Sequence, residues 1–287
     1  MSRIRPSVTS SPLTSPSLTS PSTTHRPRIT WPLAVPATAG ALFLLIPLAA
    51  LLLRAPWRHL PGILTGTGAL GALRLSLLCA TAATLCSLAL GVPLAWVLAR
   101  TDHPATTVLR ALVTLPLVLP PVVGGVALLL ALGRTGLVGR HLATWFGVSL
   151  PFTTAAVVVA ETFVAMPFLV ITVEGALRSA DRDLEEAAAT LGSGPFATFR
   201  RVTLPLAAPG LLAGGVLAWA RALGEFGATI TFAGNFPDVT RTMPLTVYLA
   251  LESDPDAAVA LSLVLLATSV AVLALLRGTW MAPGTGR

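Results

Sequence analysis

Long apolar runs, separated by short segments that hold most of the charges, dominate this chain of 287 residues. A helix needs about 20 consecutive apolar residues to cross the hydrocarbon core of a bilayer. The pattern therefore predicts an all-α, polytopic membrane protein with six transmembrane helices, in contact with lipid. The expected spans are residues 33–53, 70–99, 110–132, 152–173, 208–230 and 257–276.

The third run differs from the others because it contains Pro116, Pro120 and Pro121, followed by Gly124 and Gly125. Proline removes a helix hydrogen bond and kinks the helix. In lipid, the freed carbonyls need protein or water as partners. Two interpretations stay open, namely a bent helix that lines a pathway and a kinked helix that only packs against its neighbours.

The chain ends differ in composition from the apolar centre. Residues 1–30 are dominated by Ser, Thr and Pro, and such a segment buries too little apolar surface to order itself. We expect a disordered cytoplasmic tail there, a transmembrane domain over residues 31–277, and a second short cytoplasmic tail over residues 278–287. The first apolar run begins too late and is too long for a cleaved signal peptide.

Arginine sets the expected orientation, since all 19 basic residues are Arg. With the N-terminus inside, the inner segments hold twelve arginines and the outer loops five, and the other two lie within spans. Basic residues favour cytoplasmic loops. We therefore expect a multi-pass protein of the cytoplasmic membrane with both termini in the cytoplasm. The net charge of +7 then needs no nucleic-acid partner.

The absence of lysine excludes one kind of chemistry. The phosphate-binding loop of NTPases needs a Lys after its glycines, so any ATP hydrolysis belongs to another polypeptide. Cys79 and Cys86 are too far apart for a disulfide if they lie in one helix, and no spacing of Cys or His fits a metal site. We expect no catalytic residue, metal or cofactor in this chain.

The longest inner loop predicts two short amphipathic helices. Asp181 is placed to cap the first helix, with further acids in its first turn. Gly192 is placed to end that helix in a left-handed turn, and Pro195 can begin the second helix. An amphipathic helix that lies on the bilayer surface is the plain alternative for this segment.

This loop, residues 178–205, resembles the coupling loop of ABC-importer permeases. That family's pattern is Glu-Ala-Ala, three residues, Gly, nine residues, an aliphatic residue, one residue, and Leu-Pro. The matching residues here are Glu186, Ala187, Ala188, Gly192, Val202, Leu204 and Pro205. The resemblance implies a type I ABC importer permease fold and a homodimer with a second copy of the chain. It also implies ABC ATPase subunits that carry ATP and Mg, and an extracytoplasmic anion-binding protein.

The segment after the loop resembles the molybdate permease branch, which is close to the sulfate branch. Both branches share the run over residues 220–225, whereas FGATI at 226–230 and TRTMP at 240–244 are molybdate-like. The resemblance covers roughly residues 60–277 and implies molybdate import. Import of sulfate, thiosulfate or tungstate is the alternative within the same class.

Among the ionisable residues inside predicted spans, three are candidate site residues, namely Arg221, Glu225 and Glu161. Arg221 and Glu225 lie at i and i+4, on one face of the fifth predicted helix, and each unpaired charge would cost about 2.5–3.5 kcal/mol at mid-bilayer. Arg221 could attract the anion, or the two residues could form a structural ion pair. Glu161, in the fourth span, departs from the neutral residue expected of the family. A secondary ion-coupled transporter that uses all three as a proton relay is the alternative of another class, and the coupling loop argues against it.

Overall fold

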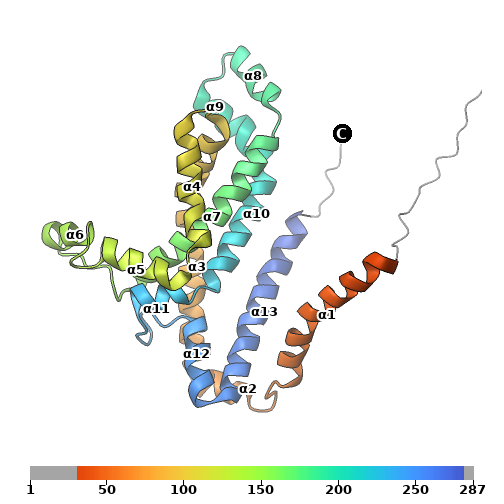
Figure 1. The fold of residues 1–287 in the computed structure, drawn as a ribbon, viewed down its shortest axis with the longest axis vertical. Helices are drawn as coiled ribbons and strands as arrows, with labels where there is room; N and C mark the ends of the chain where they lie inside the picture. Colours follow the sequence, from red (N-terminus) through yellow and green to blue (C-terminus); the bar gives the residue numbers. More distant parts are fainter. Residues whose placement is uncertain (1–30, 67, 281–287) are drawn as a thin grey trace, which may run out of the picture. The chain divides into compact units, whose positions relative to one another are not determined.

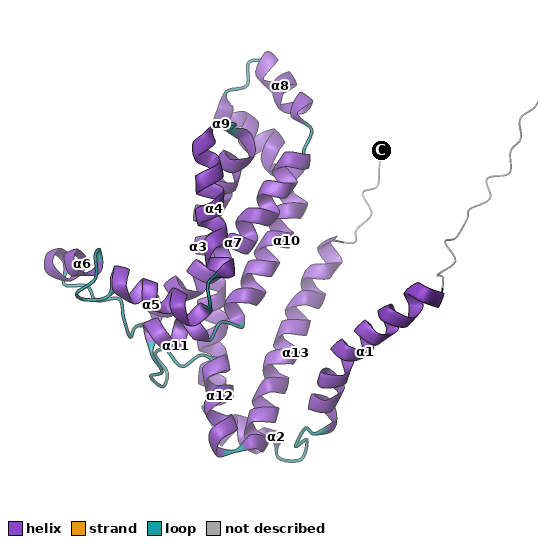
Figure 2. Cartoon of the chain, viewed as in Figure 1, coloured by secondary structure: helices purple, strands orange, loops and turns teal. Residues whose placement is uncertain are grey.

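The computed structural model describes residues 31–66 and 68–280, which form helices joined by short loops, with no β-strand among them (Figures 1 and 2). Residues up to Leu48 and residues from Ala49 onward form two units, and each is described by itself. In chain order the elements are α1 (Trp31–Leu53), α2 (Leu60–Gly66), α3 (Ala69–Arg100), α4 (Pro104–Val118), α5 (Pro121–Leu132), α6 (Gly139–Phe146), α7 (Thr154–Ser179), α8 (Arg182–Thr190), α9 (Pro195–Thr198), the π-helical turn η1 (Phe199–Thr203), α10 (Leu204–Leu223), α11 (Gly227–Ala233), α12 (Met243–Ser253) and α13 (Pro255–Trp280).

Five helical stretches in the described part of the chain are long and apolar enough to cross a membrane. They lie in α1, α3, α7, the continuous segment α9–η1–α10, and α13. The bent pair of α4 and α5 raises the number to six if it counts as one span. The predicted class, an all-helical polytopic membrane protein, is therefore confirmed.

The third predicted span, residues 110–132, is wrong as a single helix. The chain changes direction by 118° between Val118, the last residue of α4, and Pro121, the first of α5. Leu119 has left the helix, with a ψ of 134°, and neither Pro120 nor Pro121 has an N–H to continue the helical hydrogen bonds. The break follows directly from the proline pair.

The fifth predicted span, residues 208–230, has both ends misplaced. The helical stretch starts at Pro195 and ends at Leu223, and α11 follows only after a break that begins at Gly224. The second helix of the predicted loop is thus the first part of this span, connected by η1. We attribute the wide turn of η1 to Pro205, whose ring in a regular α-helix would clash with the carbonyl four residues earlier.

The two short helices that follow these breaks, α5 and α11, pack against each other. A Cβ added to Gly125 of α5 would lie 2.7 Å from the Cβ of Thr231 and 2.9 Å from the carbonyl oxygen of Ala228 in α11. Gly227 likewise lies against Pro121 at the first break. Polar backbone groups freed in lipid need protein partners, and here each broken helix lies beside the break of the other.

Helices α3, α7 and α10 form the centre of the second unit and lie side by side (Figure 1). In lipid, helices associate through close van der Waals packing, which small side chains permit. The buried core between these three helices accordingly contains many alanines, namely Ala80, Ala83, Ala95, Ala99, Ala165, Ala207, Ala218 and Ala222.

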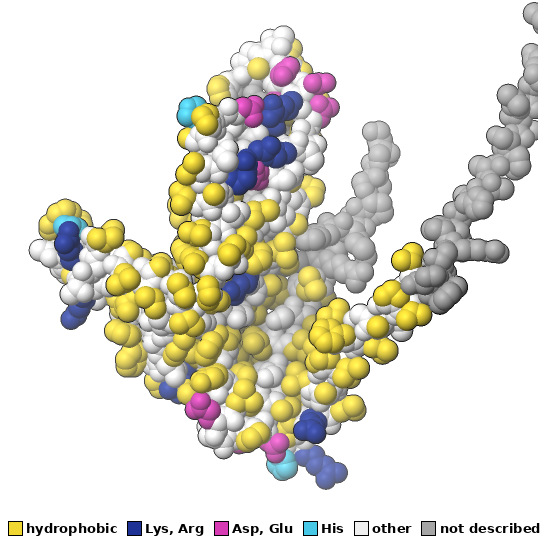
Figure 3. Space-filling model, viewed as in Figure 1, with side chains coloured by type: hydrophobic (Ala, Val, Ile, Leu, Met, Phe, Trp, Pro, Cys, Tyr) yellow, Lys and Arg dark blue, Asp and Glu magenta, His cyan; other side chains and the backbone are white. Residues whose placement is uncertain are grey.

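The surface of the second unit separates apolar from charged side chains. Hydrophobic side chains cover much of the face seen in Figure 3, whereas a group of arginine and acidic side chains lies near the end that carries α8 and further charged side chains lie at the lower end of the view. Leu78, Leu85 and Leu217 are 57%, 62% and 48% exposed. Such large apolar side chains would be a liability in water, and a bilayer solvates them.

The predicted tails lie mainly outside the described residues, which leave out 1–30 and 281–287. In the described residues, α13 extends to Trp280, and the predicted boundary after residue 277 stays a prediction.

Candidate functional site

The predicted coupling loop, residues 178–205, contains two helical segments joined by a left-handed turn. The Asp181 carboxylate accepts a hydrogen bond from the N–H of Asp183 at 3.0 Å and so caps α8. Gly192 has a φ of 85°, which glycine adopts without strain. Pro195 begins the second segment. These three local features agree with the sequence expectation.

The seven residues that match the family pattern lie mostly at the surface of the second unit. Glu186, Ala187, Gly192 and Pro205 are exposed, and Ala188, Val202 and Leu204 are half-buried. Beside them, Leu184, Leu191 and Phe196 are 48%, 89% and 76% exposed. Apolar side chains exposed among polar ones are typical of a surface that binds another protein.

Glu185, which the sequence reasoning missed, is half-buried, unlike its exposed neighbours Glu186 and Ala187. Its Oε1 accepts hydrogen bonds from Nη2 of Arg100 at 2.5 Å and from Oγ1 of Thr203 at 2.9 Å. One carboxylate thus joins α8 to the last residue of α3 and to the last residue of η1. The available signal was the helical spacing, because Glu185 and Ala188 share one face of α8 and both are half-buried.

A second cluster at the same end of the unit was also missed. Glu174 of α7 accepts hydrogen bonds from Arg110 of α4 and Arg178 of α7, at 2.7 and 2.9 Å. Both arginines also donate to the Leu98 carbonyl, and Arg182 donates to the Ala99 carbonyl. These carbonyls have no partner within their helix because α3 ends there, and cations are favourable at such a terminus.

The intramembrane residues are brought together, although not on one continuous helix as predicted. Because α10 ends at Leu223, Glu225 lies in the break, and its Oε2 is 2.6 Å from Nη1 of Arg221. Its Oε1 accepts the N–H of Ala228 in α11 at 2.7 Å. Glu225 is 1% exposed, as is Glu161 of α7.

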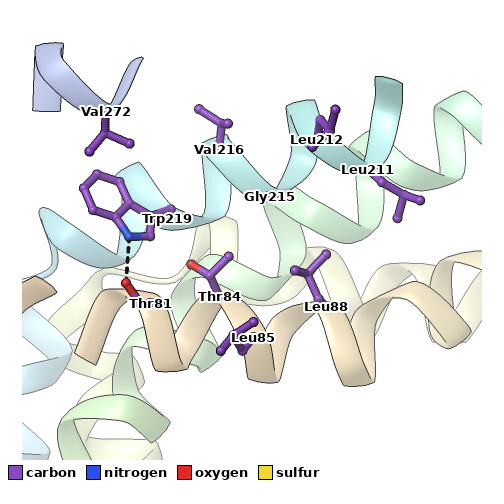
Figure 4. A pocket seen from close by; sticks show the side chains of 10 residues that line it. All are labelled: Thr81, Thr84, Leu85, Leu88, Leu211, Leu212, Gly215, Val216, Trp219 and Val272. Carbon is purple, nitrogen blue, oxygen red and sulfur yellow. Dashed lines mark hydrogen bonds between the residues drawn. The ribbon is translucent and has the colours of Figure 1, made fainter. Parts of the chain in front are cut away.

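An open apolar groove of about 480 Å³ lies between α3, α10 and α13. Figure 4 shows its lining residues, among which Trp219 donates a hydrogen bond to Oγ1 of Thr81 at 3.3 Å. The other lining residues are Thr84, Leu85, Leu88, Leu211, Leu212, Gly215, Val216 and Val272. No charged side chain lines this groove, so it offers an oxyanion no cation.

Comparison with known proteins places this geometry in a family. The profile described as "Binding-protein-dependent transport system inner membrane component" matches residues 91–282. The chain is 53% identical over 239 residues to the molybdenum transport system permease protein ModB of Mycobacterium tuberculosis, covering 83% of this chain and 90% of that protein. It is 37% identical over 236 residues to the sulfate transport system permease protein CysT of Salmonella typhimurium, covering 81% and 85%.

Among solved structures, a bacterial ABC transporter involved in the import of the acidic polysaccharide alginate has a similar fold. Its TM-score is 0.70 at 17% sequence identity, with 89% of this chain and 96% of that chain covered. The fold is therefore that of ABC importer permeases, as the sequence predicted.

The ion pair across the second break generates a stability prediction. Arg221→Gln leaves the Glu225 carboxylate buried without its cation, and removing one partner of a buried pair typically costs about 3–5 kcal/mol. We expect a lower midpoint of thermal unfolding in detergent. The double change Arg221→Gln with Glu225→Gln removes both charges at similar volume and should regain most of that stability.

Arg58→Gln is the matched control, since Arg58 is an exposed arginine of the same unit. It should leave the unfolding midpoint unchanged. A double variant as unstable as Arg221→Gln would contradict the pairing of these two side chains and would make Glu161 the next partner to test.

Proposed function

The chain belongs to the family of binding-protein-dependent transport system inner membrane components, and we propose that it is the membrane-spanning subunit of an ATP-driven molybdate importer. The observation that carries the proposal is the loop around α8, where the exposed Glu186 and Ala187 and their exposed apolar neighbours form a surface suited to docking. The close relation to molybdenum permeases over most of the chain supports molybdate as the substrate.

The other parts of the importer follow from this proposal. No reaction takes place in this chain, and ATP and Mg are bound by separate ABC ATPase subunits docked on the α8 loop. A second copy of the chain completes the transmembrane part, and an extracytoplasmic binding protein delivers the anion. When the ATPases close on ATP, the docked loops move and the pathway between the two copies changes from inward-facing to outward-facing.

Two alternatives have less support, namely import of another anion by the same kind of importer and transport by a secondary ion-coupled carrier. Sulfate, thiosulfate or tungstate import would use the same architecture, but identity to the molybdenum permease exceeds that to the sulfate permease. A secondary transporter with a relay through Arg221, Glu225 and Glu161 would have no use for the exposed loop. Arg221 and Glu225 are moreover engaged with each other, and Glu225 also accepts the Ala228 N–H.

Uptake of molybdate tests the proposed function directly. We expect proteoliposomes that contain this chain, with an ABC ATPase and an anion-binding protein from its own genome, to accumulate molybdate only with ATP. Excess unlabelled tungstate and sulfate identify the preferred anion by competition. Stronger inhibition by sulfate than by unlabelled molybdate would assign the chain to sulfate transport, and uptake driven by a proton gradient without ATP would defeat the proposal.

The turn at Gly192 generates a prediction about coupling. Gly192→Pro forces φ from 85° to about −65° and misdirects α8. We expect at least a tenfold loss of the ATP hydrolysis that the binding protein stimulates, with membrane insertion unchanged, and Glu186→Arg should act similarly by placing a cation on the docking surface. Gly194→Ala is the control, because Gly194 has a φ of −69° and free space for a Cβ. Normal stimulation in both test variants would refute a docking role for the loop.

The expected orientation is tested by labelling. Four arginines lie at the α8 end, namely Arg100, Arg110, Arg178 and Arg182. Basic residues favour the cytoplasmic side. After replacement of Cys79 and Cys86, we expect a cysteine at Ser193 to react with an impermeant maleimide only in inside-out vesicles. A cysteine at Asn235 should react only in intact cells. Labelling at residue 193 in intact cells would show that the loop faces the outside, which contradicts the expected topology. An ATPase in the cytoplasm could then not dock on this loop.

A further inference from the structure

Two adjacent acids of α8 have opposite surroundings. Glu186 is exposed, and its carboxylate has no hydrogen-bond or ion-pair partner in the described part of the chain. The Glu185 side chain is only 20% exposed and holds both Arg100 and Thr203. Glu186 is therefore free to contact a partner protein, whereas Glu185 is engaged in contacts with other helices of this chain.

Little else fixes the position of α8. None of its residues is fully buried, and α8 packs mainly against α9 and η1 among the neighbouring elements, so packing contributes little to its position. Its two covalent connections are non-helical, with extended backbone at Ala180 and Asp181 and the left-handed turn at Gly192. Arg182 adds a contact to the Ala99 carbonyl, but this contact is long, at 3.4 Å. The Glu185 carboxylate therefore provides the strongest contact between α8 and the transmembrane helices.

The partners of Glu185 are the ends of two transmembrane segments. Arg100 is the last residue of α3 and is 10% exposed. Its Nε and Nη1 are buried without a partner among the described residues, so its charge depends on Glu185. Thr203, 1% exposed, is the last residue of the π-helical turn that leads into α10. π-helical turns are frequent at functional sites, and here one lies where α8 is attached to the fifth span.

We propose that Glu185 is a positioning residue that transmits the displacement of α8 to α3 and α10 through Arg100 and Thr203. The inference rests on the proposed function and adds to it the contact that converts docking into helix movement. Glu186 and the exposed apolar residues hold the ATPase, and Glu185 connects the docked helix to the pathway. Loss of Glu185 should therefore separate ATP hydrolysis from transport, and loss of Glu186 should weaken docking.

The experiment compares conservative variants in the complete importer in proteoliposomes. Glu185→Gln removes the charge at constant size, and Thr203→Val removes the hydroxyl at constant shape. For each variant we would measure the ATPase subunit that co-purifies, the rate of ATP hydrolysis, and the molybdate transported per ATP. We expect assembly and hydrolysis within twofold of the wild type, and at least a threefold fall in molybdate per ATP.

Asp183→Asn is the matched control, because Asp183 is an exposed acid of the same helix whose side chain has no partner among the described residues. This variant should transport as much molybdate per ATP hydrolysed as the wild type does. Arg100→Gln with Glu185→Gln separates transmission from stability, since it leaves no uncompensated charge. If the contact only stabilises the fold, this double variant regains the ratio and the inference fails. If the contact transmits movement, the ratio stays low.

The remaining outcomes are also decisive. A wild-type ratio in both Glu185→Gln and Thr203→Val would overturn the inference, and so would loss of assembly in both, because the contact would then serve folding. Transport of molybdate by the wild-type importer tests the proposed function separately. A wild-type complex that hydrolyses ATP without moving molybdate would therefore count against the substrate and not against Glu185.

Discussion

The need to satisfy every backbone N–H and C=O inside hydrocarbon governs this structure. It makes the apolar runs helical, and it also restricts where a helix can stop. Both internal breaks, after Val118 and after Leu223, are followed by short helices that pack on each other, with Gly125 beside Ala228. A break in one helix is tolerated because the other supplies protein next to it, so the two irregular segments depend on one another.

The same requirement places the charged side chains. At the second break, Glu225 both accepts the Ala228 N–H and pairs with Arg221, so one carboxylate supports the start of α11 and neutralises an intramembrane cation. At the α8 end, the free carbonyls of Leu98 and Ala99 accept hydrogen bonds from arginines of three other helices. Charges therefore collect where helical backbone stops, and the end of α3 becomes the point at which α4, α7 and α8 meet.

The sequence was sufficient to locate the apolar segments, because the hydrophobicity of a residue does not depend on the fold. The prolines of residues 110–132 indicated a kink but not a change of direction of 118°, because hydrophobicity carries no information on direction. The break after Leu223 was not located. The local features of the loop were predictable from Asp181, Gly192 and Pro195, whose effects act within one turn. Glu185 was not, because its role depends on Arg100, 85 residues away in the chain, and its neighbour Glu186 carried the recognisable pattern.

The scarcity of unpaired positive charge within the membrane-spanning part bears on where anion selectivity resides under the proposed function. The open groove is lined by apolar residues and two threonines, and the intramembrane arginine is already paired with Glu225. Under the proposed function, a transport path lined by such side chains would bind a dianion weakly, and weak binding is what release on the far side requires. Discrimination among molybdate, tungstate and sulfate would then fall to the proposed binding protein that delivers the anion. The membrane subunit must instead convert ATP-driven movement into opening of the path, and its most specific polar contacts, those of Glu185 and Glu174, lie on that side of the molecule.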